Sequence, residues 1–318
     1  MAKSAYLTWL ARALTADTLP PSAPTAPAAE DMVMGYATGY GPAEIAPFVR
    51  SLRTVFAGPV ALVVDQEPAL LAFLKQHDVE ALSSRGNKSP GWKPHAVVER
   101  FAEFAELLAA RPWIRNVLLT DIRDVIFQAP PFEPPLDRLE FFDEYDGHPL
   151  ADHAFDTKHI TAVVGEDFAH ALRDKACVCV GTVIGPREII IQFCKTILLL
   201  GAIPRSAVGG AFGADQATCN IVAHLGLLDS VIRPNYGRIA TIGLTDPARL
   251  SLQDDKILNP DGSASPIVHQ YDRHPLFADY VNQRWRSDLR AVSRNEKTLG
   301  TRLRRVRESF SRRRPEPR

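Results

Sequence analysis

Two aspartates three positions apart lie in the middle of the chain, directly after an apolar run. The run, residues 117–119, is typical of a strand buried on both faces of a parallel sheet, and Asp121 and Asp124 follow it. Two neighbouring carboxylates repel each other, whereas a divalent cation between them removes the repulsion and can also bind a substrate phosphate. The alternative is structural: Asp121 caps a turn, and Asp124 pairs with Arg123 or another surface cation. The position after a buried strand favours the metal site.

A histidine much later in the chain is the third candidate ligand. His269 closes a short apolar run, residues 266–270. Imidazole suits the later transition metals, so two aspartates and one histidine favour Mn²⁺, with Mg²⁺ as the second choice. A lone histidine at a strand end is more often a hydrogen-bonded structural residue, and that alternative stays open; His274 is the weaker candidate. We predict that the His269 ring faces Asp121 and Asp124.

Alternating strand and helix patterns surround these residues. Continuous apolar runs predict strands, and apolar residues three or four positions apart predict helices. The expected strands cover residues 32–37, 60–64, 117–119, 176–184 and 266–270. The expected helices cover residues 45–56, 69–76, 97–110, 186–201 and 216–225. This order indicates an open, mostly parallel α/β sheet with helices on both faces, in which ligands bind beyond the carboxyl ends of the strands.

A few residues set the expected boundaries of these elements. Pro47 fits its helix if it lies in the first turn. Asp215 is a good N-cap residue, and Gly226 is a good residue to end the same helix. Residues 127–166, rich in proline, aspartate and histidine, are expected to form a long irregular insertion beside the site.

The composition excludes several classes of protein. The 318 residues suffice for one large domain or two small ones, and a hydrophobic content of 46% excludes a wholly disordered chain. Lys plus Arg and Asp plus Glu each number 37, so there is no overall basic footprint, and we expect no nucleic-acid partner. No apolar run approaches the ~18 residues of a membrane span. The four cysteines are too few for a disulfide framework and indicate reduced, buried thiols in a cytoplasmic protein.

The two ends of the chain differ from the middle. The first 14 residues carry a short amphipathic pattern in which Arg12 argues against a secretory signal, and a Pro/Ala linker follows at residues 19–29. Eight arginines lie in residues 302–318, either as a solvated tail or as a peripheral contact with an anionic membrane at its cytoplasmic face. We divide the chain into a helix with linker, a central domain and a basic tail: residues 1–30, 31–285 and 286–318.

The segment around the two aspartates resembles a known family. Residues 118–132 resemble the metal-binding motif of GT-A fold glycosyltransferases that use a nucleotide-sugar donor. Most members carry D-x-D, and this chain is similar to the D-x-x-D variant of bacterial polysaccharide glycosyltransferases and collagen glucosyltransferase-like domains. The resemblance covers residues 31–285 and implies a single large domain of GT-A type, a Rossmann-like fold with a mixed, mostly parallel sheet flanked by helices. In that family both aspartates and a late histidine hold manganese on the donor diphosphate, and these positions match Asp121, Asp124 and His269.

The resemblance also implies roles for other residues. The donor-recognition strand of the family matches residues 34–40, and its acceptor segment matches residues 179–185, where a cysteine replaces the usual polar residue. The donor-side candidates are Ala37, Thr38, Gly39 and Tyr40. The candidates on the acceptor or sugar side are Gly181, Thr182 and Asn220. The catalytic candidates, from a D-Q motif, are Asp215 and Gln216.

Three basic residues complete the donor-binding candidates. Lys93 and Arg100 are candidates for contacts with the phosphates or the ribose, and exposed cations at the start of a helix are the alternative. Arg123 stands between the two aspartates, where collagen-type members often have a tyrosine that can stack on the base.

The expected function is transfer of a sugar from a nucleotide-diphosphate sugar to a glycan or lipid-linked acceptor. The resemblance implies manganese dependence, a place in surface polysaccharide biosynthesis and, from the late histidine, retention of the anomeric configuration. One alternative is a metal-dependent phosphohydrolase or phosphotransferase, which would need a nucleophilic aspartate at a different spacing. The other is a non-catalytic module of the same fold that binds a nucleotide-sugar or a membrane.

Overall fold

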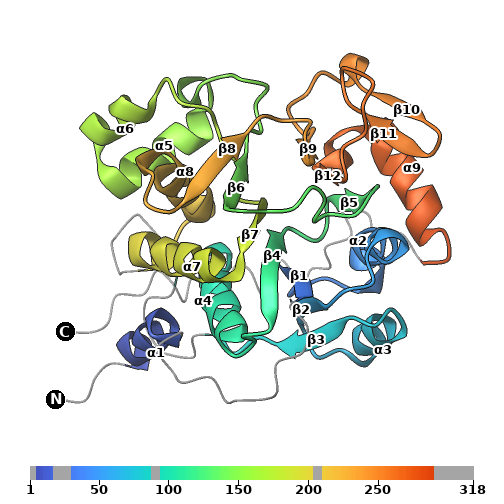
Figure 1. Cartoon of the computed structure of the whole chain (residues 1–318), viewed down its shortest axis with the longest axis horizontal. Helices are drawn as coiled ribbons and strands as arrows, with labels where there is room; N and C mark the ends of the chain where they lie inside the picture. Colours follow the sequence, from blue (N-terminus) through green and yellow to red (C-terminus); the bar gives the residue numbers. More distant parts are fainter. Residues whose placement is uncertain (1–4, 17–29, 87–93, 203–209, 290–318) are drawn as a thin grey trace, which may run out of the picture.

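A seven-stranded sheet forms the centre of the molecule (Figure 1). The computed structural model describes residues 5–16, 30–86, 94–202 and 210–289. In order across the sheet, the strands are β3 (Glu80–Ser83), β2 (Val60–Val64), β1 (Glu30–Tyr36), β4 (Ile114–Thr120), β7 (Thr182–Pro186), β6 (Leu139–Phe142) and β8 (Ser230–Arg233). The strand β7 is antiparallel to both of its neighbours, and the other pairs of adjacent strands are parallel.

Helices cover both faces of this sheet. One face carries α2 (Pro42–Val55) and α3 (Pro68–Gln76); the other carries α1 (Ala5–Leu14), α4 (Ala96–Ala109), α7 (Arg187–Gly201) and α8 (Ala214–Leu225). The side chains of β1 alternate between the two cores, with Met32 and Met34 beside α4 and α7, and Val33 beside α2. Burial on both faces explains the continuous apolar runs. The predicted single-domain, mostly parallel α/β architecture is confirmed.

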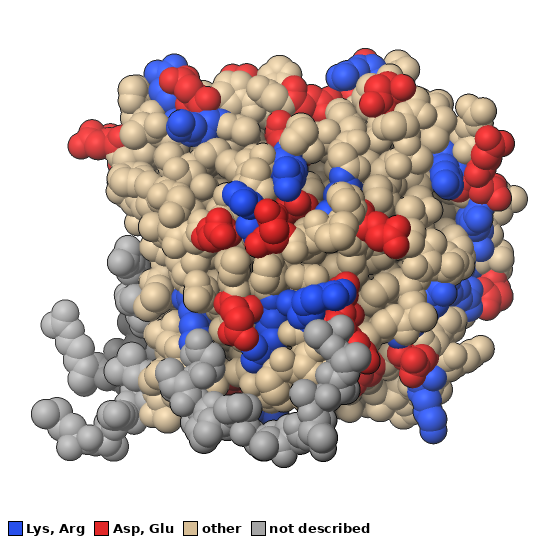
Figure 2. Space-filling model, in the orientation of Figure 1, with Lys and Arg blue, Asp and Glu red and all other residues tan. Residues whose placement is uncertain are grey.

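The first helix is part of the same core. Leu10 and Ala13 of α1 are buried in the core formed with α4 and α7, and Arg12 donates to Glu106 of α4 across 2.9 Å. The expected linker at residues 19–29 and the arginine-rich residues 302–318 lie outside the described residues. None of the described helices is both long enough and apolar enough to cross a bilayer. On the face shown in Figure 2, acidic and basic side chains are interspersed.

The strand order reverses between β1 and β4. The chain places β2 and β3 on one side of β1 and then returns to place β4 on the other side. Gly35 of β1 lies opposite Thr120 of β4, so the carboxyl ends of these two strands are adjacent. In open α/β sheets, ligands bind in the crevice outside the carboxyl ends of the strands at such a reversal.

A small second sheet lies beyond this crevice. It has the order β5 (Val125–Phe127), β12 (Ile267–His269) and β9 (Ile239–Thr241), and its pairing places His269 opposite Val125. The same side of the molecule also carries a hairpin and a helix: β10 (Ser251–Gln253) with β11 (Lys256–Leu258), and α9 (Pro275–Arg286). Two short 3₁₀ turns lie there as well, η3 (Pro247–Arg249) and η4 (Tyr271–Arg273). Phe277 and Val281 of α9 pack with the outer side of this sheet.

A lobe at the other side contains η2 (Leu150–Asp152), α5 (Ala154–Val164) and α6 (Glu166–Leu172), packed on α8 (Figure 1). The prediction that residues 127–166 form an irregular insertion was therefore wrong, because β6 lies inside the central sheet and α5 is an ordinary helix. The apolar run of β6 has only four residues and stands between polar segments, so no strand pattern was visible there.

Three further boundaries differ from the predictions. The strand expected at residues 176–184 is confined to β7, and Ala176 and Val178 form isolated bridges only. Asp215 is not an N-cap residue, because α8 begins at Ala214 after the left-handed Gly213. Pro47 lies inside α2 and not in its first turn, because the helix already begins at Pro42.

Candidate metal centre

Three predicted ligands meet beyond the carboxyl end of β4. His269 Nε2 lies 3.8 Å from Asp121 Oδ2 and 3.9 Å from Asp124 Oδ1, and all three ligand atoms lie within 4.8 Å of one another. Asp121 directly follows β4, Asp124 directly precedes β5, and His269 ends β12. The arrangement arises because β5 pairs with β12, which brings a distant segment of the chain to the end of the central sheet.

The turn between β4 and β5 is fixed by packing and by backbone hydrogen bonds. Ile122 points inward and is buried, and the missing side chain of Gly35 makes room for it: a Cβ at Gly35 would lie 2.0 Å from Ile122 Cδ1. Asp121 N donates to Gly181 O, and Gln270 N donates to Asp124 O, each across 2.7 Å. Both aspartates are therefore held by their own main chain.

Gly181 lets β7 approach the ligands closely. A Cβ at this position would lie 2.5 Å from His269 Cε1 and 2.8 Å from Asp121 Oδ2, closer than real contacts allow. Gly181, expected on the acceptor or sugar side, therefore lies directly against the ligand cluster.

The donor set fits a divalent cation. The distances of 3.8 and 3.9 Å are too long for hydrogen bonds, but they lie within the ~4.2 Å that can separate two atoms bound to one ion at ~2.1 Å each. The other ring nitrogen of His269, Nδ1, lies 3.5 Å from Thr241 Oγ1 and 3.7 Å from Cys179 Sγ, so Nε2 is the nitrogen that faces the two aspartates. His269 is only 1% exposed, whereas the Asp121 side chain is 37% exposed, so the cluster opens to solvent on that side.

Arg100 links the cluster to α8. Its guanidinium donates to Asp121 Oδ1 across 2.7 Å and to Asp215 Oδ2 across 3.0 Å. The Arg100 side chain is nearly buried, so it is not the exposed cation at a helix start that was the alternative. Its guanidinium is already paired with the carboxylates of Asp121 and Asp215. Burial raises the pKa of Asp215 to about 6, although Arg100 opposes this change. Burial also raises the pKa of Asp124, against the opposing effect of His269.

The donor-side candidates form the turn after β1. Ala37 is buried and donates from its main chain to Val63 O, whereas Gly39 has a left-handed φ of 83° and donates from its N–H to Asp65 Oδ2. Thr38, also in this turn, is partly exposed. Burial raises the pKa of Tyr40, and the charges of Arg123, Asp121 and Asp124 act on its hydroxyl, which places its ring beside the cluster.

Of the two remaining donor-side candidates, Arg123 and Lys93, the structure describes only Arg123. Arg123 pairs with Asp272 across 3.1 Å, and the described residues show no ion pair between Arg123 and Asp124. Lys93 lies outside the described residues.

The candidates from the D-Q motif and the sugar side have structural partners. Gln216 Oε1 accepts from Val180 N, and its Nε2 donates to Val178 O and to Glu144 Oε1. Asn220 forms hydrogen bonds with both main-chain groups of Val178. The two amides therefore hold the segment that leads to Gly181. Thr182 is fully buried, and its hydroxyl has no hydrogen-bond partner within the described parts of the chain.

The structure contains a second group of possible metal ligands that the sequence did not predict. Ligand atoms of Glu144, His153, Asp156 and Cys177 lie within 4.8 Å of one another. Burial and the neighbouring carboxylates raise the pKa of the Cys177 thiol, and burial with the charge of Asp156 raises that of Glu144. Cys177 is one of the four cysteines that the sequence indicates to be buried thiols, and the other three residues lie in the segment 127–166, in which the sequence shows no strand or helix pattern.

No protein-family model and no curated protein matches this chain.

Proposed function

We propose that this protein is a metal-dependent glycosyltransferase of GT-A type that uses a nucleotide-diphosphate sugar. The observation that carries the proposal is the position of Asp121, Asp124 and His269 beside the reversal of strand order between β1 and β4. A ligand bound in that crevice would meet the turn of Gly39 and Tyr40 on one side and the three metal-binding side chains on the other.

The chemistry follows from the charges at the site. Bound Mn²⁺, or Mg²⁺ as second choice, would act as a Lewis acid that neutralises the departing diphosphate. Asp121, Asp124 and His269 would hold the cation, and the Arg123 guanidinium, whose charge acts on Tyr40 and Asp124, would contact the phosphates. Groups that stabilise charge on the leaving diphosphate are expected to supply most of the rate enhancement.

Asp215 acts in this proposal through Arg100. Its carboxylate is 7% exposed and binds the same guanidinium as Asp121, so it positions Arg100 and holds Asp121 in place. Gln216 has the corresponding role for the segment before Gly181. The acceptor is a glycan or a lipid-linked sugar, and retention of configuration is the stereochemical outcome that the family resemblance favours.

The test is nucleotide binding with and without metal. A ligand that binds only the folded state raises the melting temperature Tm, so a nucleoside diphosphate should raise Tm only when Mn²⁺ is present. Asp121→Asn and Asp124→Asn should abolish this shift and Mn²⁺-dependent nucleotide-sugar hydrolysis. Asp254→Asn, an exposed residue of the β10–β11 hairpin, is the matched control and should retain both.

Three other outcomes would replace the proposal. Release of phosphate from simple phosphate esters would indicate a phosphohydrolase. Metal-dependent nucleotide-sugar binding without hydrolysis or transfer would indicate a non-catalytic module. If neither Mn²⁺ nor any nucleoside diphosphate changes Tm, the crevice is not a nucleotide site.

A further inference from the structure

The second cluster has the composition of a metal site of a different class. We propose that Glu144, His153, Asp156 and Cys177 bind a structural Zn²⁺ ion that ties the α5–α6 lobe to the central sheet. Their side chains offer one thiolate, one imidazole and two carboxylates, four ligands in all. The proposal is independent of the glycosyltransferase assignment and of the first metal centre.

The distances already approach those of a tetrahedral ion. Donor atoms bound to one zinc ion at ~2.0–2.3 Å lie ~3.3–3.8 Å apart. Cys177 Sγ lies 2.9 Å from Asp156 Oδ2 and 3.4 Å from Glu144 Oε1, and His153 Nδ1 lies 3.2 Å from Asp156 Oδ2. These separations are therefore close to those that a single bound zinc ion requires.

The charge of the cluster needs a cation. Asp156 and Cys177 are 0% exposed and Glu144 is nearly buried. Within the described chain, neither carboxylate is paired with a lysine or an arginine: the neighbouring donors are the Gln216 amide, cysteine thiols and the His153 ring. Two buried carboxylates that have no lysine or arginine partner are costly, because each ionised group loses its hydration on burial.

One atom of the cluster lacks any partner. Asp156 Oδ1 is buried and has no hydrogen bond to any residue that the structure describes, although Oδ2 of the same carboxylate has three neighbours. Buried polar atoms are nearly always satisfied, so an orphan oxygen in this setting indicates a bound group. An ion bound to the Asp156 carboxylate would neutralise its charge, and it would satisfy Oδ1 where both oxygens bind the ion.

The donor types select zinc over manganese. Thiolate and imidazole ligands favour Zn²⁺, whereas the first centre, with two carboxylates, a histidine and access to solvent, suits the harder Mn²⁺. Four protein ligands without an open position are typical of a structural site. The Gln216 amide, which donates to Glu144 Oε1 and to Asp156 Oδ2, supplies the outer hydrogen bonds that orient metal-bound carboxylates.

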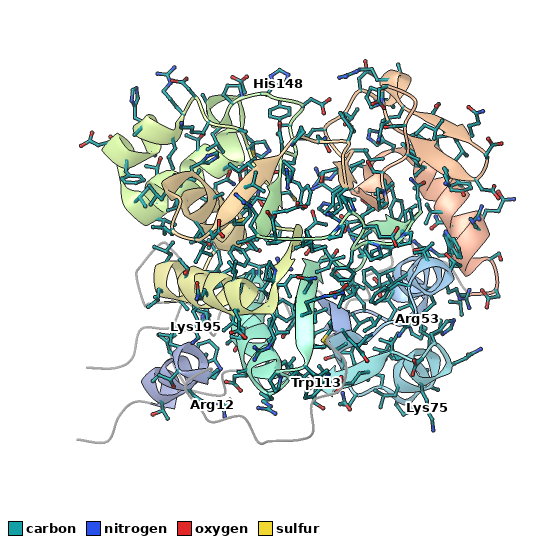
Figure 3. The ribbon with its side chains drawn as sticks, viewed as in Figure 1. Arg12, Arg53, Lys75, Trp113, His148 and Lys195 are labelled. Carbon is teal, nitrogen blue, oxygen red and sulfur yellow. The ribbon has the colours of Figure 1, made fainter. Side chains whose placement is uncertain are left out.

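The ion would add side-chain links between segments that main-chain hydrogen bonds already connect, such as the one from Glu144 N to Cys177 O. Glu144 follows β6, His153 and Asp156 lie at the start of α5, and Cys177 precedes β7. The apolar cluster around Ile160 and Leu172 is small, and it includes Ala217 and Ile221 of α8. His148, labelled at the top of Figure 3, marks the loop between β6 and α5 that the ion would fasten.

The test is cobalt substitution in the full-length protein. After removal of metal with a chelator, Co²⁺ bound at this cluster should give a thiolate-to-cobalt charge-transfer band in the near ultraviolet and the strong visible bands of tetrahedral Co²⁺. Zinc should displace these bands stoichiometrically. Cys177→Ser should lose the charge-transfer band, whereas Cys194→Ser, a buried thiol in α7, should retain it.

If Cys177→Ser fails to fold, His153→Ala and its control His148→Ala test the same site with less disruption. His153 is partly exposed and caps α5 by accepting from Asp156 N, and His148, earlier in the same connection, is more exposed, so neither substitution to alanine removes a core side chain. His153→Ala should weaken zinc affinity by about tenfold or more, and His148→Ala should leave it unchanged.

Two results would overturn the proposal. One is that the protein binds no Zn²⁺ or Co²⁺, by metal analysis and by competition with a chromophoric chelator. The other is that the charge-transfer band survives in Cys177→Ser but disappears in Asp121→Asn or Cys179→Ser, which would place the cobalt at the first centre. If Asp121→Asn keeps the band but loses the Mn²⁺-dependent nucleotide response, the two metal centres are separate. The zinc site can then stand even if the proposed function fails.

Discussion

Asp124 is the residue at which stability and metal binding oppose each other. Its side chain is only 16% exposed, and burial, together with the nearby Asp121 carboxylate, raises its pKa despite His269. Because the folded protein binds the proton of this group more tightly than the unfolded chain, the ionised form lowers the free energy of unfolding at neutral pH. A raised carboxyl pKa of this kind, caused by burial and a neighbouring carboxylate, is typical of functional sites.

We therefore predict opposite effects of Asp124→Asn on stability and on binding. Without metal, Tm should rise, because a buried charge and a like-charge repulsion are removed. With Mn²⁺, the metal-induced increase in Tm should vanish.

Asp121→Asn should also abolish the increase in Tm, but it should lower Tm in the absence of metal, since Arg100 loses a partner. In the double variant the losses of binding should not add, because the site is already empty of metal in each single variant. An undiminished Mn²⁺ response in Asp124→Asn would contradict the ligand assignment.

Gly181→Ala tests the close approach of β7 to the cluster. The added methyl group would lie 2.5 Å from His269 Cε1, so the ring or the strand must shift by about an ångström and disturb the ligand set. Overpacking of this kind costs ~1–3 kcal/mol of stability. We expect a lower Tm and loss of Mn²⁺ binding, measured by calorimetric titration. Gly237→Ala, where the nearest atom would be 3.8 Å away, is the control. Normal Mn²⁺ affinity in Gly181→Ala would show that the cluster does not bind the metal.

The buried Asp215 predicts a pH dependence of stability. Its pKa is raised to about 6 in the folded protein from an unfolded value near 3.8. The contribution of this group is therefore fully present below the unfolded pKa and is lost as the pH rises through 6. Compared with Asp215→Asn, the wild type should gain on the order of 1 kcal/mol in unfolding free energy when the pH falls from 7 to 5. Urea unfolding at both pH values measures it, and parallel pH profiles of the two proteins would contradict it.

At the scale of elements, the turn between β4 and β5 depends on a glycine in the neighbouring strand. A Cβ at Gly35 would lie 2.0 Å from Ile122 Cδ1, so Gly35→Ala should cost ~1–3 kcal/mol and displace both metal-binding aspartates. Ile122→Val removes the Cδ1 atom and alone should cost ~0.5–1.5 kcal/mol. In the double variant the two costs should be less than additive, and Mn²⁺ binding should partly return. Additive costs without recovery of binding would show that the packing of Ile122 does not set the turn.

The elements that the sequence predicted share strong local patterns. β2 and the helices α2, α4 and α7 carry long apolar patterns, and each lies within a few residues of its expected bounds. The elements that escaped detection depend on pairing at long range. β6 has four residues and becomes a strand through β7 and β8, and β5 has three residues and needs β12. Such short strands are stabilised by their neighbours in space, which local sequence does not reveal.

The same difference separates the two clusters at the scale of the whole molecule. Asp121 and Asp124 could be predicted because they follow one buried strand in a local motif, and His269 because it ends another. The second cluster has ligands from three segments, and its position depends on how α5 packs on α8. The N-cap assignment of Asp215 failed for a similar reason: its carboxylate binds Arg100 on a different helix.

The charge distribution along the chain predicts membrane association. Basic and acidic residues balance at 37 each, yet eight arginines and only two glutamates lie in residues 302–318, so the rest of the chain is slightly acidic. Each basic residue near an anionic surface contributes ~1 kcal/mol, and the attraction falls off over a Debye length of ~8 Å at physiological ionic strength. We propose that the tail binds anionic membranes and is dispensable for catalysis.

Vesicle sedimentation tests this proposal. The full-length protein should bind vesicles that contain phosphatidylserine, should not bind neutral vesicles, and should dissociate steeply as salt rises. A chain truncated after Thr301 should lose vesicle binding while its Tm and its nucleotide-sugar hydrolysis stay unchanged, because the described core ends before the tail. A full-length variant with the eight arginines changed to glutamine separates charge from length: it should behave as the truncated chain does. If the truncated chain binds anionic vesicles as well as the full-length protein, the tail is not the membrane contact.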